Sequence, residues 1–355
     1  MVGHPNSITA NAFESPASAR IESYVRRRGG DATRIVALTP DASTREYFRI
    51  PWAGETAVAA VYPEPFDPDL HPFIDVTRLF EAAKLPVPSI LDIDPALGVI
   101  TQEDLGDRQL RRVFESSSED ERESYVERAI QIVADIQAAT DLAYERNSIA
   151  GRLAFDEAKL SWEMDFFMEH YFRSYRRERL SHAEGAELRA ELNDVCSELA
   201  ARPRVLCHRD FHSSNLIVDQ RDRLRIIDHQ DARMGPASYD LVSLLLDRVT
   251  AVPSLAEIRQ RRLFFLEERR SRSLPEIAPD EFAQEFRLMT VQRCLKACGT
   301  FSYQTGVAGR AATYEQFIAP MLVIAAQAAE WLNRFPALRA AVAARVPSDA
   351  VRPSN

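Results

Sequence analysis

The segment of residues 207–231, CHRDFHSSNLIVDQRDRLRIIDHQD, holds the side chains of this chain that are best suited to chemistry. Two short apolar runs, at 216–218 and 224–227, flank a polar turn and predict a β-hairpin. A hairpin brings the start of its first strand beside the end of its second. We therefore expect Asn215 and Asp228 at the same open end, with Asp210 five residues before Asn215 on the loop that leads into the hairpin.

Carboxylate and amide oxygens are hard ligands that suit Mg²⁺, which takes one or two protein groups and completes its shell with phosphate oxygens and water. Phosphoryl transfer uses such a set: one Asp accepts the proton of the attacking hydroxyl, and an Asn and a second Asp hold the metal. The order His208-Arg209-Asp210, then Asn215, fits a kinase catalytic loop. The pattern predicts Asp210 as the catalytic base and Asn215 and Asp228 as metal ligands, although the short pattern alone also arises by chance.

Three histidines near this segment, His208, His212 and His229, leave other functions open. The order His-x-Asp-x-His is also compatible with a metal-dependent hydrolase, although no further ligand group at fixed spacing accompanies it. A non-catalytic nucleotide-binding protein is the third class, and it would have no need of the base Asp210. In the kinase interpretation His208 supports the loop by hydrogen bonds, and His212 faces the substrate.

The hydrophobic pattern predicts an α+β fold of two lobes, a small antiparallel sheet with one helix and a larger, mostly helical part. A capped helix is expected from Ser15-Pro16 to Gly29-Gly30. Strand-like runs follow at 32–38, 44–50 and 56–62, then a helix at 71–85 and strands at 89–93 and 98–102. Helical patterns dominate afterwards, at 118–141, 155–178, 184–201, 237–248, 278–301 and 312–332. The expected divisions are a disordered lead-in (1–14), an N-lobe (15–102), a connector (103–107) and a helical C-lobe (108–355).

Composition and charge limit the classes of protein to which the chain can belong. The 355 residues carry a net charge of -9 and are 46% hydrophobic, which is typical of a globular protein and argues against a nucleic-acid partner. No apolar run is long enough to span a membrane, and the N-terminus lacks the pattern of a secretory signal. Four cysteines without metal-site spacing are expected to be buried free thiols of a cytoplasmic protein. The sequence indicates no oligomeric state.

Two stretches, CHRDFHSSNLIV and IIDHQDARMGPASYDLVSLL, resemble the aminoglycoside phosphotransferase and choline kinase superfamily. The resemblance implies a protein-kinase-like fold, with ATP and Mg²⁺ as cofactors and a small-molecule hydroxyl as acceptor. Within the superfamily, DASTREYFR, GPASYDLVSLLLD and LMTVQRCLKACGTF resemble the branch of anomeric sugar kinases of cell-wall (peptidoglycan) recycling. That branch phosphorylates the C1 hydroxyl of N-acetylmuramate and N-acetylglucosamine. Aminoglycosides, choline and homoserine remain alternative acceptors.

The resemblance also assigns nucleotide-binding residues. It places Asp41, Ala42 and Ser43 in the turn over the phosphates, and Glu103 and Leu105 in the connector whose backbone meets adenine. Kinases of this fold carry a Lys on the third strand, paired with an acid on the following helix. Here the third strand has no Lys and the acid position falls on Asp75, so Arg45 or Arg49 is expected to supply the positive charge. Asp240 is expected to fix the catalytic loop from a helix start.

The acceptor side is the least constrained part of the prediction. The stretch LMTVQRCLKACGTF contributes Gln292, Arg293 and Lys296, and His212 and Asp231 complete the candidates. Arg293 and Lys296 are three residues apart on one helical face, where they could meet a carboxylate or a sugar oxygen. The alternative is an ordinary amphipathic helix with solvated cations. A cationic pair favours N-acetylmuramate, which carries a lactyl carboxylate, over polycationic aminoglycosides.

Overall fold

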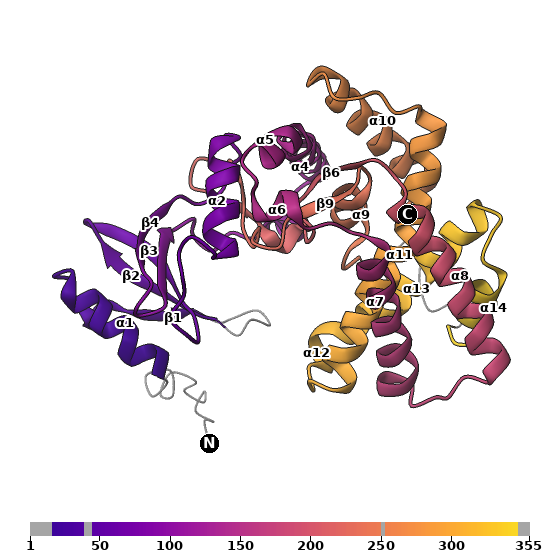
Figure 1. Ribbon diagram of the computed structural model, residues 1–355, viewed down its shortest axis with the longest axis horizontal. Coiled ribbons are helices and arrows are strands. Elements are labelled where there is room, and N and C mark those ends of the chain that lie inside the picture. The colour runs from indigo at the N-terminus through magenta and orange to yellow at the C-terminus, as the bar shows by residue number, and fades with distance from the viewer. Residues whose placement is uncertain (1–15, 39–44, 250–252, 347–355) are drawn as a thin grey trace. The chain divides into compact units, whose positions relative to one another are not determined.

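The structure, a computed structural model, describes residues 16–38, 45–249 and 253–346. The chain divides into two compact units. The first consists of Met1–Arg108 and Ile217–Gln230, and the second of Gln109–Leu216 and Asp231–Asn355. The first is built on an antiparallel sheet and the second is mostly helical, so the α+β fold of two lobes is confirmed (Figure 1).

The sheet of the first unit has five strands in the order β1-β2-β3-β5-β4, and each pair of neighbours is antiparallel. The strands are β1 (Val36–Leu38), β2 (Glu46–Trp52), β3 (Glu55–Val61), β4 (Ile90–Asp94) and β5 (Val99–Glu103). Ala53 and Gly54 connect β2 to β3 with positive φ angles of 46° and 88°, the left-handed pair of a two-residue hairpin turn. The small antiparallel sheet predicted from the strand-like runs is therefore confirmed.

Two helices cover opposite faces of this sheet. Successive residues of a strand point to opposite sides, so two neighbouring residues of β5 contact different helices. Ile21, Tyr24 and Val25 of α1 (Pro16–Arg27) pack in one core with Val99 of β5. The neighbouring residue of β5, Ile100, packs instead against α2 (Pro72–Ala82). Both helices expected in this part of the chain, at 15–30 and 71–85, therefore form, and the sheet carries two helices where the predicted fold class gave it one.

The predicted hairpin forms from β7 (Leu216–Val218) and β8 (Leu224–Ile226). In its turn the Asp219 carboxylate accepts hydrogen bonds from the backbone N–H groups of Arg221 and Arg223, both at 2.9 Å. From β8, the Arg225 guanidinium donates to the two carboxylate oxygens of Glu103, at 3.0 and 2.6 Å. This bidentate pair fastens the hairpin to the end of β5.

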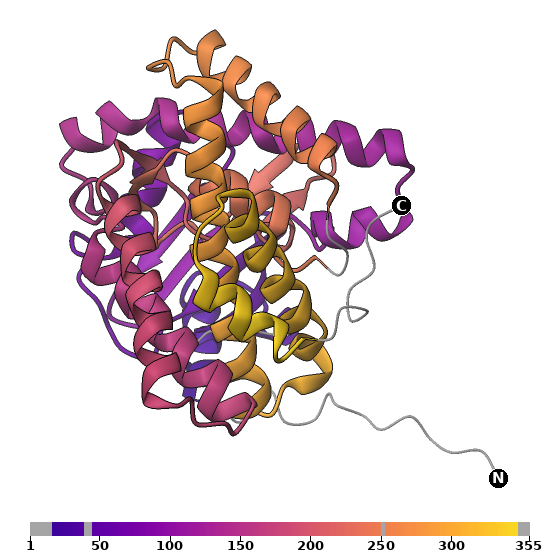
Figure 2. The ribbon, with the colours of Figure 1, turned by 90° about the vertical axis from the view of Figure 1, so that its right-hand side faces the viewer.

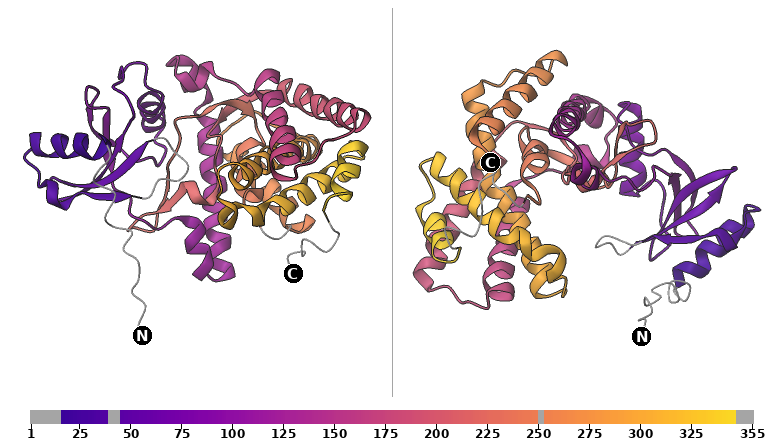
Figure 3. Two further views of the ribbon diagram at one scale, coloured as in Figure 1. Left: turned by 90° about the horizontal axis from the view of Figure 1, so that it is seen from below. Right: turned by 180° about the vertical axis from the view of Figure 1, so that it is seen from behind.

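The second unit is organised around the 28-residue helix α11 (Pro279–Gly306), which other helices surround (Figures 2 and 3). Most residues between Phe282 and Ser302 of this helix are buried. Helices that contact it include α7 (Glu157–Phe167), α8 (His182–Ala200), α9 (Tyr239–Leu246), α10 (Leu255–Ser271) and α13 (Ile318–Trp331). The other helices of this unit are α3 (Leu110–Ser116), α4 (Glu119–Ala138), α5 (Thr140–Glu145), α6 (Ile149–Arg152), α12 (Ala311–Tyr314) and α14 (Pro336–Ala343).

A π-helical segment, η2 (Met168–Tyr175), continues α7 along α11. Two glycines of α11 make this close contact possible. A Cβ atom at Gly299 would lie 2.8 Å from Cα of Phe167, and one at Gly306 would lie 2.9 Å from the carbonyl oxygen of Ser174. Because real Cβ atoms do not approach backbone so closely, larger residues at either position would push η2 and the end of α7 away from α11.

One long helix escaped the sequence prediction. α10 is rich in charged residues and buries little more than Ile258, Phe265 and Arg269, so its hydrophobic period is weak. A usable signal was nevertheless present, because Ser254 and Glu257 form a capping box, the S-x-x-E pattern of a helix start.

The four cysteines are free and buried, as predicted. Across the residues that the structure describes, no helix is both long and apolar enough to cross a membrane.

Candidate functional site

The predicted catalytic loop connects β6 (Arg204–Cys207) to the hairpin, and β6 pairs antiparallel with β9 (Arg233–Pro236). A side chain in the first turn of α9 fixes the first residues of this loop. The buried Asp240 carboxylate accepts the backbone N–H groups of His208, at 2.6 Å, and Arg209, at 3.0 Å. Arg209 has a φ of 87°, which is costly for a residue with a side chain. The two bonds to Asp240 hold the loop in this strained conformation.

Two cations of α11 hold the Asp210 carboxylate. Nη2 of Arg293 and Nζ of Lys296 both lie 3.1 Å from its Oδ1 atom. Burial acts to raise the pKa of Asp210, but Lys296, Arg209 and Arg293 outweigh burial and hold that pKa well below its ordinary value. Asp210 is therefore an ionised carboxylate that can accept a hydrogen bond, or a proton, from a hydroxyl.

Arg293 also contacts a second acid that sequence reasoning missed. Its Nη2 atom lies 3.0 Å from Oδ2 of Asp247, which directly follows α9, and 2.9 Å from Oγ of Ser243. The side chains of Arg293 and Asp247 are 3% and 6% exposed, so this is a buried ion pair. Asp247 stood in the sequence at the end of GPASYDLVSLLLD, but nothing in its spacing indicated a partner on α11.

Asn215 is oriented by the same loop. Its Nδ2 atom donates to the backbone carbonyl of Asp210 at 2.9 Å, and its backbone N–H donates to the carbonyl of His212 at 2.8 Å. Because the amide nitrogen is used inside the loop, the amide oxygen is the atom left to act as a metal ligand. His212 is itself buried, and burial lowers its pKa to about 4, so the imidazole is neutral at pH 7.

In the first unit, Asp228 lies two residues after the end of β8 and has a left-handed φ of 64°. Its Oδ1 atom accepts hydrogen bonds from Nε2 of Gln230 at 2.8 Å and Nη2 of Arg45 at 3.4 Å. The Arg45 guanidinium also lies 5.7 Å from the ring centres of Tyr47 and Tyr62. Of the two arginines expected to replace the missing Lys of the third strand, Arg45 is the one beside the predicted metal ligand.

The other candidates of the first unit have different partners. Arg49 forms ion pairs with Asp104, at 2.6 Å, and Asp107, at 2.9 Å. Glu103 is paired with Arg225, as described above, and Leu105 is buried. Asp75 lies in the first turn of α2. Asp41, Ala42 and Ser43 lie outside the described residues.

The remaining acceptor-side candidates lie in the second unit. Gln292 is fully buried and donates from Nε2 to Oε2 of Glu163 on α7, at 2.8 Å. Asp231 pairs with Arg209, at 2.8 Å. Arg293 and Lys296 are held by Asp210 rather than solvated on an amphipathic helix. Glu163 was not predicted, since only the packing of α7 on α11 brings it to this place.

The Asp228 carboxylate of the first unit and the Asn215 amide oxygen of the second are each, by their chemistry, suited to Mg²⁺. Within the ranges 16–38, 45–249 and 253–346, no group of three or more His, Cys, Asp or Glu side chains is placed to hold a metal ion.

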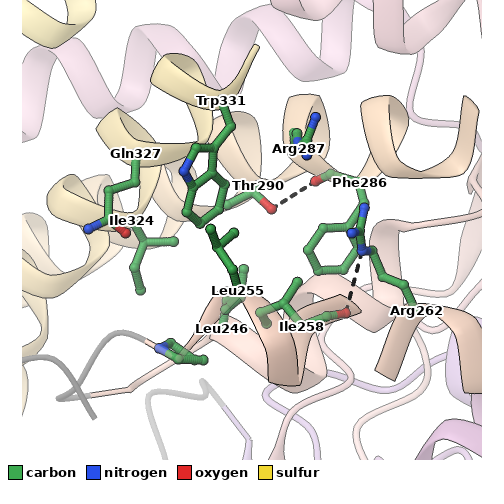
Figure 4. A pocket seen from close by; sticks show the side chains of 11 residues that line it. Leu246, Leu255, Ile258, Arg262, Phe286, Arg287, Thr290, Ile324, Gln327 and Trp331 are labelled. Carbon is green, nitrogen blue, oxygen red and sulfur yellow. Dashed lines mark hydrogen bonds between the residues drawn. The ribbon is translucent and has the colours of Figure 1, made fainter. Parts of the chain in front are cut away.

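A small pocket is visible elsewhere in the second unit, between α10, α11 and α13 (Figure 4). It is lined mainly by apolar side chains, among them Phe286, Ile258 and Trp331. Its volume of about 20 Å³ has room for little more than one water molecule, so it holds neither a nucleotide nor a sugar.

Comparison with known proteins shows the family of this chain. The sequence model of the phosphotransferase enzyme family matches residues 34–274, more than half of the chain. The chain belongs to this family and is a phosphotransferase.

Two curated relatives are more specific. The N-acetylmuramate/N-acetylglucosamine kinase of Neisseria meningitidis serogroup B is 30% identical over 271 residues, which are 74% of this chain and 76% of that protein. The N-acetylmuramate/N-acetylglucosamine kinase of Pseudomonas aeruginosa is 29% identical over 276 residues, or 76% of each chain.

Solved structures bear on the fold alone. The choline kinase of Cryptosporidium parvum superposes with a TM-score of 0.60 at 10% sequence identity, and the match covers 92% of this chain and 98% of that one.

Proposed function

We propose that this protein is an ATP- and Mg²⁺-dependent kinase that phosphorylates the anomeric C1 hydroxyl of N-acetylmuramate, N-acetylglucosamine or both. Support comes from the two curated kinases above, which match about three quarters of the chain. We place the reaction in the cytoplasm, where ATP is available, and assign it to the recycling of peptidoglycan sugars.

One observation favours such an acceptor over the other substrates of the superfamily. The Asp210 carboxylate is surrounded by cations, with Arg293 and Lys296 at 3.1 Å and Arg209 at 3.8 Å. These cations already occupy the Asp210 carboxylate, so it is less available to the amino groups of an aminoglycoside or the quaternary ammonium of choline than an unpaired carboxylate would be. A neutral or acidic sugar does not need an unpaired carboxylate for binding.

In the proposed reaction Asp210 orients the C1 hydroxyl of the sugar and accepts its proton. An anomeric hydroxyl is more acidic than an ordinary alcohol, so one carboxylate held in place suffices as the base. Asp240 keeps the loop in position through its two bonds to the backbone. Asn215 and Asp228 would hold Mg²⁺, whose chemistry is to neutralise the phosphate charge that develops during transfer. Arg45 adds positive charge next to Asp228.

The test is a screen of acceptors by ADP release. Enzyme and Mg-ATP are incubated separately with N-acetylmuramate, N-acetylglucosamine, glucose, an aminoglycoside, choline and homoserine. Phosphorus-coupled NMR then locates the new phosphate. We expect turnover with the two N-acetylated sugars and a C1 phosphate. A phosphate at C6, or turnover only with the other acceptors, would refute the proposal while leaving the phosphotransferase class intact.

A further inference from the structure

Lysine is rare in this chain, and its positions are informative. Of the 44 basic residues only three are lysines: Lys84, Lys159 and Lys296. Lys84 follows α2 in the first unit, whereas Lys159 and Lys296 lie in the second unit, on α7 and α11. An ammonium group is a compact charge with three freely rotating donors, which differs from the planar fork of arginine.

A short chain of contacts connects Lys159 to the Asp210 region. Nζ of Lys159 lies 3.7 Å from Oε1 of Glu163, whose other oxygen accepts the hydrogen bond from Gln292. Gln292 stands one helical turn before Lys296, which contacts Asp210. The two lysines are therefore neighbours across the α7–α11 contact, and the packing of Gly299 against Phe167 holds these helices close together.

Both ammonium groups remain accessible to a ligand. The side chains of Lys159, Lys296 and Asp210 are 24%, 16% and 25% exposed. The 3.7 Å separation from Glu163 is too long for a hydrogen bond, and we find none from Nζ of Lys159 to any residue that the structure describes. Donors of Lys159 are thus available for an acceptor outside the protein.

The charge around Lys159 also favours an anion. Burial lowers the pKa of Lys159, the Glu163 carboxylate opposes this effect, and Arg209, Arg233 and Lys296 lower the pKa further. Nearby cations thus disfavour the charged ammonium, and an incoming carboxylate would relieve that repulsion.

Trp162 lies beside Lys159 on α7 and is 56% exposed. Nζ of Lys159 lies 4.0 Å from the centre of the indole ring, and the ring of Phe166 lies 5.6 Å away. The exposed indole offers a flat apolar surface next to this polar cluster. The flat indole matches the C–H face of a pyranose ring.

We propose that α7 recognises the acceptor: Lys159, together with Lys296, binds the carboxylate of an acidic N-acetylated sugar, and Trp162 packs against its ring. The inference rests on the proposed function and extends it, because it predicts a preference for N-acetylmuramate over N-acetylglucosamine. These two sugars differ by the lactyl group that carries the carboxylate. The neutral sugar has no carboxylate to add to the contacts that these ammonium groups already make with Glu163 and Asp210.

Steady-state kinetics test the role of Lys159. We expect Lys159→Met to raise the KM for N-acetylmuramate about tenfold, the loss of one charge-assisted contact, without raising the KM for ATP. The ratio of kcat/KM for N-acetylmuramate to that for N-acetylglucosamine should fall by a similar factor. Lys159→Arg should retain most of the ratio, and the exposed Lys84→Met is the matched control that should leave it unchanged. An unaltered ratio in Lys159→Met would overturn the inference.

A binding measurement gives a second readout. In protein labelled with ¹³C at the lysine ε-carbon, only three lysine signals are expected, and the Lys159→Arg and Lys84→Met variants assign them. N-acetylmuramate should shift the signals of Lys159 and Lys296 and leave that of Lys84 in place, and N-acetylglucosamine should shift the Lys159 signal less. If both sugars are phosphorylated and N-acetylmuramate does not shift the Lys159 signal, this inference is refuted and the proposed function is not. Absence of turnover with either sugar refutes the proposed function instead.

Discussion

Arg293 of α11 bridges Asp210 of the catalytic loop and Asp247 at the end of α9, with one nitrogen 3.1 Å and 3.0 Å from their carboxylate oxygens. The Arg293 side chain is 3% exposed, so one buried cation orients the expected base and compensates a second acid. The assignment of Arg293 to sugar binding stays a prediction, and this bridge gives the residue a structural role as well.

Replacing Arg293 by Met is expected to destabilise the protein by about 3–5 kcal/mol, because it removes the nearer cation from the buried Asp247 and leaves Arg248 at 3.8 Å. Guanidinium unfolding measures the effect. The matched control is Arg259→Met, which removes an exposed cation of α10 and should change the free energy of unfolding by less than about 0.5 kcal/mol. If Arg293→Met were as stable as this control, the buried bridge would have no energetic importance.

Asp210→Asn tests the base. We expect turnover to fall by about 10²–10⁴-fold, while fold and nucleotide binding stay nearly intact, since the amide keeps the shape but not the basicity of the carboxylate. Single-turnover kinetics and nucleotide titration separate the two effects. Turnover within a few-fold of the parent would remove Asp210 from the mechanism.

Asp228→Ala tests the metal ligand. Activity should be lost at ordinary Mg²⁺ concentrations, because one of the two proposed protein ligands is removed. A chelator should abolish the activity of the parent, and added Mg²⁺ should restore it. Gln230→Ala is the comparison variant, since it removes the hydrogen bond to Oδ1 of Asp228 but no ligand. Full activity of Asp228→Ala would contradict the assignment.

His71 should make the stability of the first unit depend on pH. Burial against the rings of Tyr62 and Phe66, and to a lesser degree the charge of Arg45, lower its pKa from 6.5 to about 4. Between these values the unfolded chain binds the proton and the folded one does not. The stabilising effect is therefore complete above pH 6.5 and is lost as pH falls toward 4.

We expect about 1–2 kcal/mol of this loss between pH 7.5 and pH 4.5, after allowance for partial solvent screening. Urea unfolding of the parent and of His71→Gln at the two pH values measures it. The variant should lose less stability than the parent over this range, and equal losses in both proteins would exclude His71 as the source.

Local signals explain how much of this fold could be predicted. Turn residues such as Ala53-Gly54 and the strand-like runs on either side of them depend on neighbouring residues alone, and these local signals predicted the antiparallel sheet and the hairpin around Asp219. α10 was not predicted, because a helix with a mostly charged surface has no clear apolar stripe.

The residues of the candidate site also fall into two groups, those that local sequence could predict and those that depend on contacts between distant parts of the chain. Asp210, Asn215 and Asp228 lie close together in sequence and follow a pattern with known chemistry, so they could be proposed at once. Asp247 and Glu163 could not, because their partners Arg293 and Gln292 lie 46 and 129 residues away in the chain. Only the packing of α7 and α9 on α11 brings these side chains together, and no sequence period encodes that contact.

The four cysteines, all buried, occur only in the second unit, at positions 196, 207, 294 and 298. Burial raises the pKa of each thiol, to about 12 for Cys196, so the reactive thiolate is scarce in the folded protein. A maleimide therefore alkylates these thiols only after the helices around them open, and the rate of alkylation measures the rate of that opening. Of the three tryptophans, Trp52 of β2 lies in the first unit and Trp162 and Trp331 lie in the second. With Trp162 and Trp331 replaced by Phe, the fluorescence of Trp52 would report on the sheet. The cysteines and Trp52 would then show whether the two units unfold together or one after the other.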